Sequence, residues 1–228
     1  MLATLLLATV AGGQPLVLAA GQESLYTAHV QDFPKAGWVV GGLVPVSSSP
    51  QLAGRMVDLL QPGTFVEVAG LGNAVPRPGR AGALDEVFAV PVRDDPQHPA
   101  GFVQAKGLAV LETVLGRCGT DGFLFTTVVG REMRPGSEGL FLTLEVWVKR
   151  DGEPPEHVLG GVNSAPGAKV WFAPGGGAAV VLGETVALVS ADGHPSWRSP
   201  EGETWSVLSA DARGVTVTGP RGRQVLRP

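Results

Sequence analysis

Residues 171–182 read WFAPGGGAAVVL, and residues 197–208 read WRSPEGETWSVL. Both stretches follow the pattern Trp-x-x-Pro-x-Gly, in which proline and glycine favour a tight turn after a tryptophan that begins a buried strand. Each copy continues into two apolar segments, at 178–182 and 185–190 in the first and at 204–208 and 214–218 in the second. The residues with structural roles in the two turns are Trp171, Pro174, Trp197 and Pro200. Because such a unit cannot bury its own apolar face, the repeat predicts β-meanders that stack on their neighbours.

Asp-Gly pairs at 151–152 and 192–193 end two successive units. The order Trp-x-x-Pro-x-Gly, strand, strand, Asp-Gly resembles the propeller blades of the TolB-like family, although Gly175 and Glu201 replace the usual aspartate of its turn. A closed propeller needs about four or more blades of about 40 residues, and the remaining chain is too short for that. Three arrangements stay open: strands from residues 3–30 complete the sheets, a second copy of the chain completes them, or a different β-meander shares only the turn chemistry.

The segment 57–68, VDLLQPGTFVEV, belongs to a second region of short strands that extends over 37–112. Five such strands with one apolar face each predict a small closed barrel. The region resembles the bacterial SH3-like domain, in which a hairpin corresponding to 57–68 precedes a closing Gly-Trp-Val step. Here the closing step is Gly-Phe-Val at 101–103, and Ser-Ser-Ser-Pro at 47–50 replaces the frequent Arg-x-Gly-Pro.

The SH3-like resemblance implies binding of cell-wall peptides or protein partners. The candidate binding residues are Trp38, Arg77, Arg80 and Phe102, and the expected contact loop is 70–82. A polyproline site is not favoured, because it requires a ladder of aromatic rings, and phenylalanines at alternating strand positions are expected in the core.

The composition favours an all-β protein and excludes several functional classes. The chain of 228 residues has 33 glycines, 19 prolines, and 44% hydrophobic residues. Its net charge of −4 argues against a nucleic-acid-binding protein. A single cysteine excludes a disulfide framework, and no apolar run predicts a membrane-spanning helix.

The N-terminal residues 1–20, MLATLLLATVAGGQPLVLAA, allow two interpretations. An apolar run followed by small residues is typical of a signal peptide, but no Lys or Arg precedes Lys35. The alternative is a β-hairpin of strands at 4–10 and 15–20. The sequence is therefore divided into a signal-like or strand-forming segment at 1–36, an SH3-like barrel at 37–112 and a β-meander with blade-like repeats at 120–228.

No catalytic, metal or cofactor site is expected. A Gly-x-Ser-x-Gly elbow, a phosphate-binding loop and a complete dinucleotide loop do not occur. The four histidines are far apart in sequence, and neither Asp192 with His194 nor Asp94 and Asp95 with His98 supplies a full ligand set. Cys118 follows Arg117, which could lower the pKa of its thiol, but no nearby histidine supplies a base. Cys118 is therefore expected to be an isolated cysteine in the junction between the two regions.

These observations lead to two functional hypotheses. The first is a non-catalytic binding or scaffolding protein, exported to the bacterial cell envelope, that contacts peptides or proteins through the barrel and the repeat surface. The second is a cytoplasmic structural or assembly subunit whose N-terminal strands complete the sheet. An enzyme ranks third.

Overall fold

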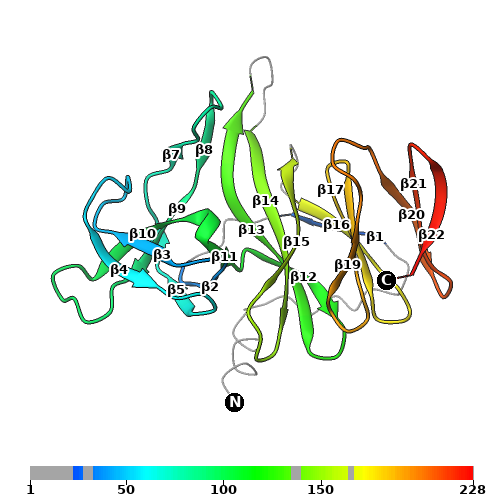
Figure 1. Ribbon diagram of the computed structural model, residues 1–228, viewed down its shortest axis with the longest axis horizontal. Helices are drawn as coiled ribbons and strands as arrows, with labels where there is room; N and C mark the ends of the chain where they lie inside the picture. Colours follow the sequence, from blue (N-terminus) through cyan, green and yellow to red (C-terminus); the bar gives the residue numbers. More distant parts are fainter. Residues whose placement is uncertain (1–22, 28–32, 135–139, 164–166, 228) are drawn as a thin grey trace.

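The computed structural model describes residues 23–27, 33–134, 140–163 and 167–227, and it confirms that the chain is all-β. The described strands form five antiparallel sheets, and the one helical segment among them is the 3-10 helix η1 at Ala105–Gly107. Figure 1 shows a lobe of two sheets on the left and, to its right, three further sheets that follow one another along the long axis.

The N-terminal lobe consists of two sheets that share one core. Sheet I has the order β11-β2-β5, with β2 at Lys35–Val39, β5 at Phe65–Val68 and β11 at Leu108–Val110. Sheet II has the order β4-β3-β10-β9-β6, with β3 at Val44–Ser47, β4 at Met56–Leu60, β6 at Gly70–Leu71, β9 at Val87–Pro91 and β10 at Ala100–Gln104. The buried side chains between the two sheets include Val39, Val66, Val46, Val90 and Val103.

The two sheets are joined at corners where one segment leaves a sheet and enters the other. β5 continues through Ala69, whose N–H donates to the carbonyl oxygen of Ala89 at 2.8 Å, into β6. β10 passes through η1 into β11 in the same way. The strand orders of this lobe end at open edges, so its ladders form two sheets rather than the closed barrel that the sequence predicted.

The hairpin expected at 57–68 is not present. β4 pairs with β3, and β5 pairs with β2, so the two halves of this segment lie in different sheets. The Pro62-Gly63 turn serves as a corner: the N–H of Gly63 donates to the carbonyl oxygen of Val39 at 2.8 Å. The alternation of apolar residues was interpreted correctly for burial, since Val66 and Val68 are buried, but it carried no information on the pairing partner.

Three sheets form a stack in the second half of the chain. Sheet III has the order β15-β14-β13-β8-β7, with β12 also paired to β13; its strands are β7 (Val75–Pro76), β8 (Ala83–Asp85), β12 (Thr113–Cys118), β13 (Gly122–Met133), β14 (Leu140–Arg150) and β15 (Glu156–Asn163). Sheet IV has the order β1-β16-β17-β18-β19, with β1 (Glu23–Thr27), β16 (Gly167–Phe172), β17 (Ala178–Leu182), β18 (Thr185–Val189) and β19 (Pro195–Arg198). Sheet V is β20-β21-β22, with β20 (Ser206–Asp211), β21 (Gly214–Gly219) and β22 (Gly222–Leu226).

Sheet IV is the middle layer of this stack and is buried on both faces. All five residues of β17 are buried. Because side chains alternate across a strand, Val180 of β17 packs into the core shared with sheet III, whereas Val181 packs into the core shared with sheet V. This explains why the segment after the first Trp-x-x-Pro-x-Gly turn is continuously apolar rather than alternating.

The two copies of the sequence repeat have different structural roles. Trp171 is buried at the end of β16, and its turn joins β16 to its ladder partner β17. Trp197 lies in β19, and its turn leads out of sheet IV into β20 of sheet V, so no hairpin forms there. The Trp197 and Trp205 rings pack edge to face with centroids 5.4 Å apart, within the core between these two sheets.

The Asp-Gly pairs mark the more regular repeat. Asp151-Gly152 joins β14 to β15, and Asp192-Gly193 joins β18 to β19, so each is the last turn of a four-strand run. In addition, β1 extends sheet IV by pairing with β16 from Glu23↔Trp171 to Thr27↔Gly167. The hairpin and the signal peptide considered for residues 1–20 fall outside the described residues.

The N-terminal lobe is fastened to sheet III by aromatic packing and a buried ion pair. The Trp38 ring lies 5.7 Å from that of Phe125 in β13 and 6.0 Å from that of Phe65 in β5. Lys35 Nζ lies 2.5 Å from Glu112 Oε2, and both side chains are less than a tenth exposed. Removing one partner of such a pair costs about 3–5 kcal/mol, because the other charge is left buried without a partner.

Segment 70–82, which the sequence predicted to be a contact loop, is partly a β-structure that connects the lobe to sheet III. Its first residues form β6, which pairs with β9. β7 pairs with β8, and β8 pairs with β13 from Ala83↔Glu132 to Asp85↔Gly130. The segment therefore contacts the protein itself, with the β7–β8 hairpin between the lobe and the stack in Figure 1.

Two glycines allow β3 to lie unusually close to β10 and η1. A Cβ at Gly101 would clash with Val46 Cγ1 and lie 2.8 Å from Val92 Cγ2. A Cβ at Gly107 would lie 2.8 Å from Val44 Cγ2. Val46 and Val44 both belong to β3 and are buried in the lobe core, so any larger residue at either glycine displaces this strand.

We predict that Gly101→Ala lowers the free energy of unfolding by about 1–3 kcal/mol, because overpacking forces β3 away from β10. Chemical denaturation followed by circular dichroism measures the change. The control is Gly42→Ala, where an added Cβ meets nothing within 4 Å. Equal stability of Gly101→Ala and the control would contradict the close packing described above.

Candidate functional site

A groove lies where β3 and β10 separate. The two strands pair at Phe102↔Ser47 alone within the described residues, and the next backbone hydrogen bond between the two chain segments runs from Val40 N–H to the carbonyl oxygen of Gly107, at 3.0 Å. Between these points the ladder is interrupted. β3 therefore has β4 on one side and, over most of its length, no paired strand on the other.

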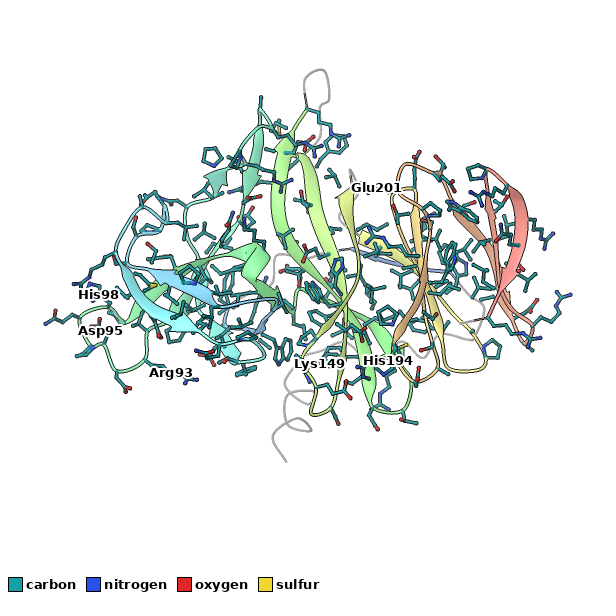
Figure 2. All side chains as sticks on the ribbon, viewed as in Figure 1. Arg93, Asp95, His98, Lys149, His194 and Glu201 are labelled. Atoms are coloured by element: carbon teal, nitrogen blue, oxygen red, sulfur yellow. The ribbon has the colours of Figure 1, made fainter. Side chains whose placement is uncertain are left out.

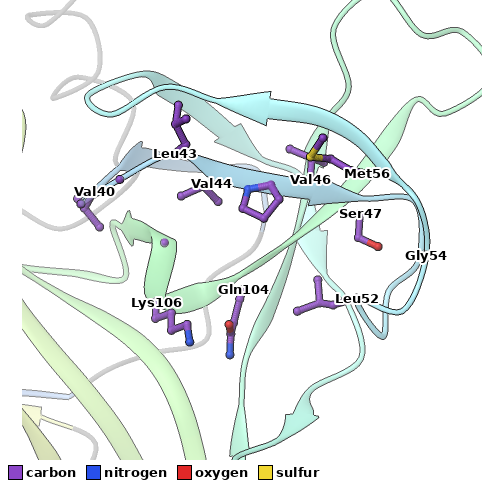
Figure 3. Close-up of a pocket in the computed structure, with 14 residues that line it drawn as sticks. Val40, Leu43, Val44, Val46, Ser47, Leu52, Gly54, Met56, Gln104 and Lys106 are labelled. Atoms are coloured by element: carbon purple, nitrogen blue, oxygen red, sulfur yellow. The ribbon is translucent and has the colours of Figure 1, made fainter.

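The groove has a volume of about 480 Å³, within the usual range of ligand-binding sites. Its lining is predominantly apolar and includes the large side chains of Leu43, Leu52 and Met56. Leu43 is 54% exposed and Met56 is 64% exposed, so the apolar lining is open to solvent. Figure 3 shows Val40 and Lys106 at one end of the groove and Leu52 and Gly54 toward the other.

The polar side of the groove is held in place by hydrogen bonds that extend into sheet III. Gln104 lines the groove, and its Nε2 donates to Asp85 Oδ2 at 2.8 Å. Arg77 Nε donates to the other carboxylate oxygen of Asp85 at 2.7 Å, and Arg77 Nη2 lies 3.3 Å from Thr143 Oγ1 in β14. A charged hydrogen bond of this kind fixes both the carboxylate and the amide that it holds.

None of the four predicted binding residues lines this groove. Trp38 is half-buried in the junction with sheet III, and Arg77 is held in the network just described. Arg80 Nε lies 3.0 Å from Glu132 Oε2 in β13. Phe102 is half-buried at the Ser47 pairing, where a Cβ on Gly72 would approach its ring to 3.0 Å. Three of the four residues therefore join parts of the fold, and the structure does not bring them together in one site.

The groove residues Leu43, Leu52, Met56 and Lys106 were not identified from the sequence. One signal was present: Pro45 lies in the middle of β3, and a proline within a strand indicates that one side of that strand lacks a continuous ladder. The other lining residues come from β4, β10, η1 and the loops beside them, so only the folded chain places them together.

Other clusters of titratable groups hold turns in place. His98 Nδ1 lies 2.8 Å from Asp95 Oδ2, and this hydrogen bond lowers the pKa of the carboxyl. His194 Nδ1 lies 3.1 Å from Glu156 Oε2. Figure 2 shows the two histidines far apart along the molecule. Within the described ranges, no group of three or more His, Cys, Asp or Glu side chains could hold a metal ion.

Comparisons of the chain with protein-family models, with curated proteins and with solved structures gave no match. Among the residues that the structure describes, no helix is long and apolar enough to cross a membrane.

Cys118 is a buried residue in the core between sheets III and IV. It ends β12, rather than lying in a linker, and is 1% exposed. Its Sγ lies 3.7 Å from the carbonyl oxygen of Ser190 and 3.9 Å from that of Gly176. Burial, with a smaller contribution from Asp192, raises the pKa of the thiol to about 11. The neighbouring Arg117 is exposed and does not activate the thiol, contrary to the effect considered from sequence.

We predict that Cys118 does not react with a thiol-specific reagent in the folded protein at mildly alkaline pH, because the group is both buried and protonated. After unfolding in guanidinium chloride, one thiol per chain should react. Colorimetric titration of the native and the unfolded protein measures both values. Rapid labelling of the native protein would show that the core between sheets III and IV opens readily.

Proposed function

We propose that this chain is a non-catalytic binding protein that takes an extended peptide segment of a partner in the groove between β3 and η1. The observation that carries the proposal is the interrupted β3–β10 ladder, which leaves an apolar groove of about 480 Å³ beside an unpaired side of a strand. An extended peptide that lies across such a groove can place alternate side chains on the apolar lining, which supplies specificity. The SH3-like resemblance of this lobe is in keeping with such a role.

The exposure of the groove also supports binding. Leu43 and Met56 are large apolar side chains, each more than half exposed, on the same groove. Burial of one such side chain by a ligand is worth about 1.5–3 kcal/mol. A ligand that covers Leu43 and Met56 would therefore gain binding free energy from their burial, whereas Val44 and Val46 on the groove floor are already packed in the core.

Selection from a random peptide display library tests this function. We expect enriched peptides to bind the wild-type chain and to lose about tenfold or more in affinity for Met56→Glu, because the substitution places a charge on the apolar lining. The matched control is Leu208→Glu, since Leu208 is 51% exposed in β20 of sheet V. Peptides that bind Met56→Glu as well as wild type, or the absence of any enrichment, would refute the proposal.

We also propose that the chain acts in the bacterial cell envelope. The signal-like composition of residues 1–20 supports export. The second candidate is a cytoplasmic assembly subunit, in which the pairing of β1 with β16 makes a segment near the N-terminus part of sheet IV. Since β1 begins at Glu23, it follows the signal-like segment, and both candidates accommodate it.

The two locations predict different masses for the native protein. Export should yield a chain that lacks about the first 20 residues but retains β1, because a signal peptide is removed during secretion. Intact-mass spectrometry of protein from its natural source measures this. A chain that begins at Met1 would exclude the removal of a signal peptide and would favour the assembly subunit.

A further inference from the structure

We infer that the outer face of sheet V is a docking surface for an anionic lipid bilayer, which it contacts through the arginines in and beside β22 and through two exposed apolar side chains. The inference does not depend on the groove, since Figure 1 shows sheet V and the N-terminal lobe at opposite ends of the long axis. It follows from the side chains on this face, from their charge and from the area that the face offers.

Sheet V has one buried face and one open face. Val215 and Val217 of β21 pack into the core shared with sheet IV. Because side chains alternate across a strand, Thr216 lies on the opposite, outer face, together with its ladder partner Val225 of β22. Within the described residues sheet V shares a core with sheet IV alone, so this outer face is the end of the stack.

Large apolar side chains are exposed on this end layer. Val225 is 58% exposed. Leu208, which lies at the bulge of β20 and outside the core with sheet IV, is 51% exposed. The end member of a stacked array needs a polar outer face to stay soluble. Two exposed apolar side chains at this position therefore indicate a surface that meets a partner.

The same layer is basic, in a chain whose net charge is −4. Residues 204–227 contain four arginines and one acidic residue, Asp211. Asp211 is already paired, because its Oδ2 lies 2.8 Å from Nη2 of Arg213. The other three arginines are exposed and form no ion pair with a described residue; they are Arg221, Arg223 and Arg227. Their charge is complementary to an anionic partner.

Charged and apolar side chains alternate along β22. Arg223 is the ladder partner of Thr218, which lies on the outer face, so Arg223 and Val225 share that face. Arg221 precedes the strand and Arg227 follows it. A soluble polyanion would neutralise the arginines but leave Val225 exposed. The surface of an anionic bilayer matches both features, since it offers phosphate headgroups and, just beneath them, acyl chains.

The size of the face favours a bilayer over a folded protein. Three strands of five or six residues, about 4.8 Å apart and rising about 3.3 Å per residue, present about 250 Å². A stable protein–protein interface needs about 800 Å² on each partner. An anionic membrane needs less contact, because each nearby arginine increases the affinity about fivefold. Three unpaired arginines together give a preference of about 100-fold for an anionic over a neutral surface.

Sedimentation of the full chain with sucrose-loaded vesicles tests the inference. Vesicles of phosphatidylcholine and phosphatidylglycerol in equal parts should bind the chain about 100-fold more tightly than vesicles of phosphatidylcholine alone. Arg223→Gln combined with Arg227→Gln should weaken binding to the anionic vesicles about 25-fold. The control is Arg93→Gln, on an exposed loop of the N-terminal lobe shown in Figure 2. All variants retain residues 1–20, so any contribution of that apolar segment is common to them.

A fluorescent label tests which face meets the membrane. Because Cys118 is buried, Val225→Cys supplies the reactive thiol for an environment-sensitive dye. Anionic vesicles should shift the emission of this dye to shorter wavelength, since the dye leaves water for the lipid interface. The matched control carries the same dye at Leu71→Cys, because Leu71 is 50% exposed in β6 of the N-terminal lobe. Its emission should not change.

Three results would overturn the inference. The first is equal binding of the chain to neutral and anionic vesicles, and the second is equal binding of the double arginine variant and the wild type. The third is an emission shift at position 71 without one at position 225. Poly-glutamate serves as the soluble acidic probe: if it binds with dependence on Arg223 and Arg227 and the anionic vesicles do not, the partner is an acidic polypeptide and the inference is wrong. Weaker vesicle binding as the salt concentration rises would support it.

Discussion

The close approach of β3 to β10 and η1 determines the shape of the N-terminal lobe. Val46 packs on Gly101 and Val44 packs on Gly107, at distances that no larger residue at these glycines would allow. Within the described residues a single ladder pair, Phe102↔Ser47, joins β3 to β10. The two valines that pack on the glycines belong both to the lobe core and to the floor of the groove. Stability and the proposed binding site therefore share these residues.

The rest of the chain depends on double-sided burial of one sheet. Sheet IV contributes alternate residues of β17 to two separate cores, so each of its faces requires a neighbouring sheet. Sheet III meets one face and also carries the N-terminal lobe on its other side, through Phe125 and the Lys35–Glu112 pair at the junction. The arrangement places the groove on a lobe whose orientation is fixed by aromatic and ionic contacts rather than by a linker.

The sequence predicted the class of fold and the positions of most strands, because apolar periodicity and Gly/Pro turns are local signals. Pairing was not predictable in the same way. Val57 and Val66 showed which residues face a core, but their strands β4 and β5 pair with β3 and β2, and nothing in the Pro62-Gly63 turn distinguishes a corner from a hairpin. Charged and aromatic residues were taken as contact residues, yet Arg77 and Trp38 make their contacts within the fold. The groove was missed because it results from the separation of two strands.

The layered order of the stack has a consequence for its dynamics. Sheet V shares one core with sheet IV, whereas sheet IV has a neighbour on each face. Such an array behaves as a one-dimensional series of nearest-neighbour interactions, in which the end member is the least costly to detach. Amide protons of β20–β22 should consequently exchange with solvent through a partial opening that leaves the other layers intact, and those of β17 only when the whole domain unfolds.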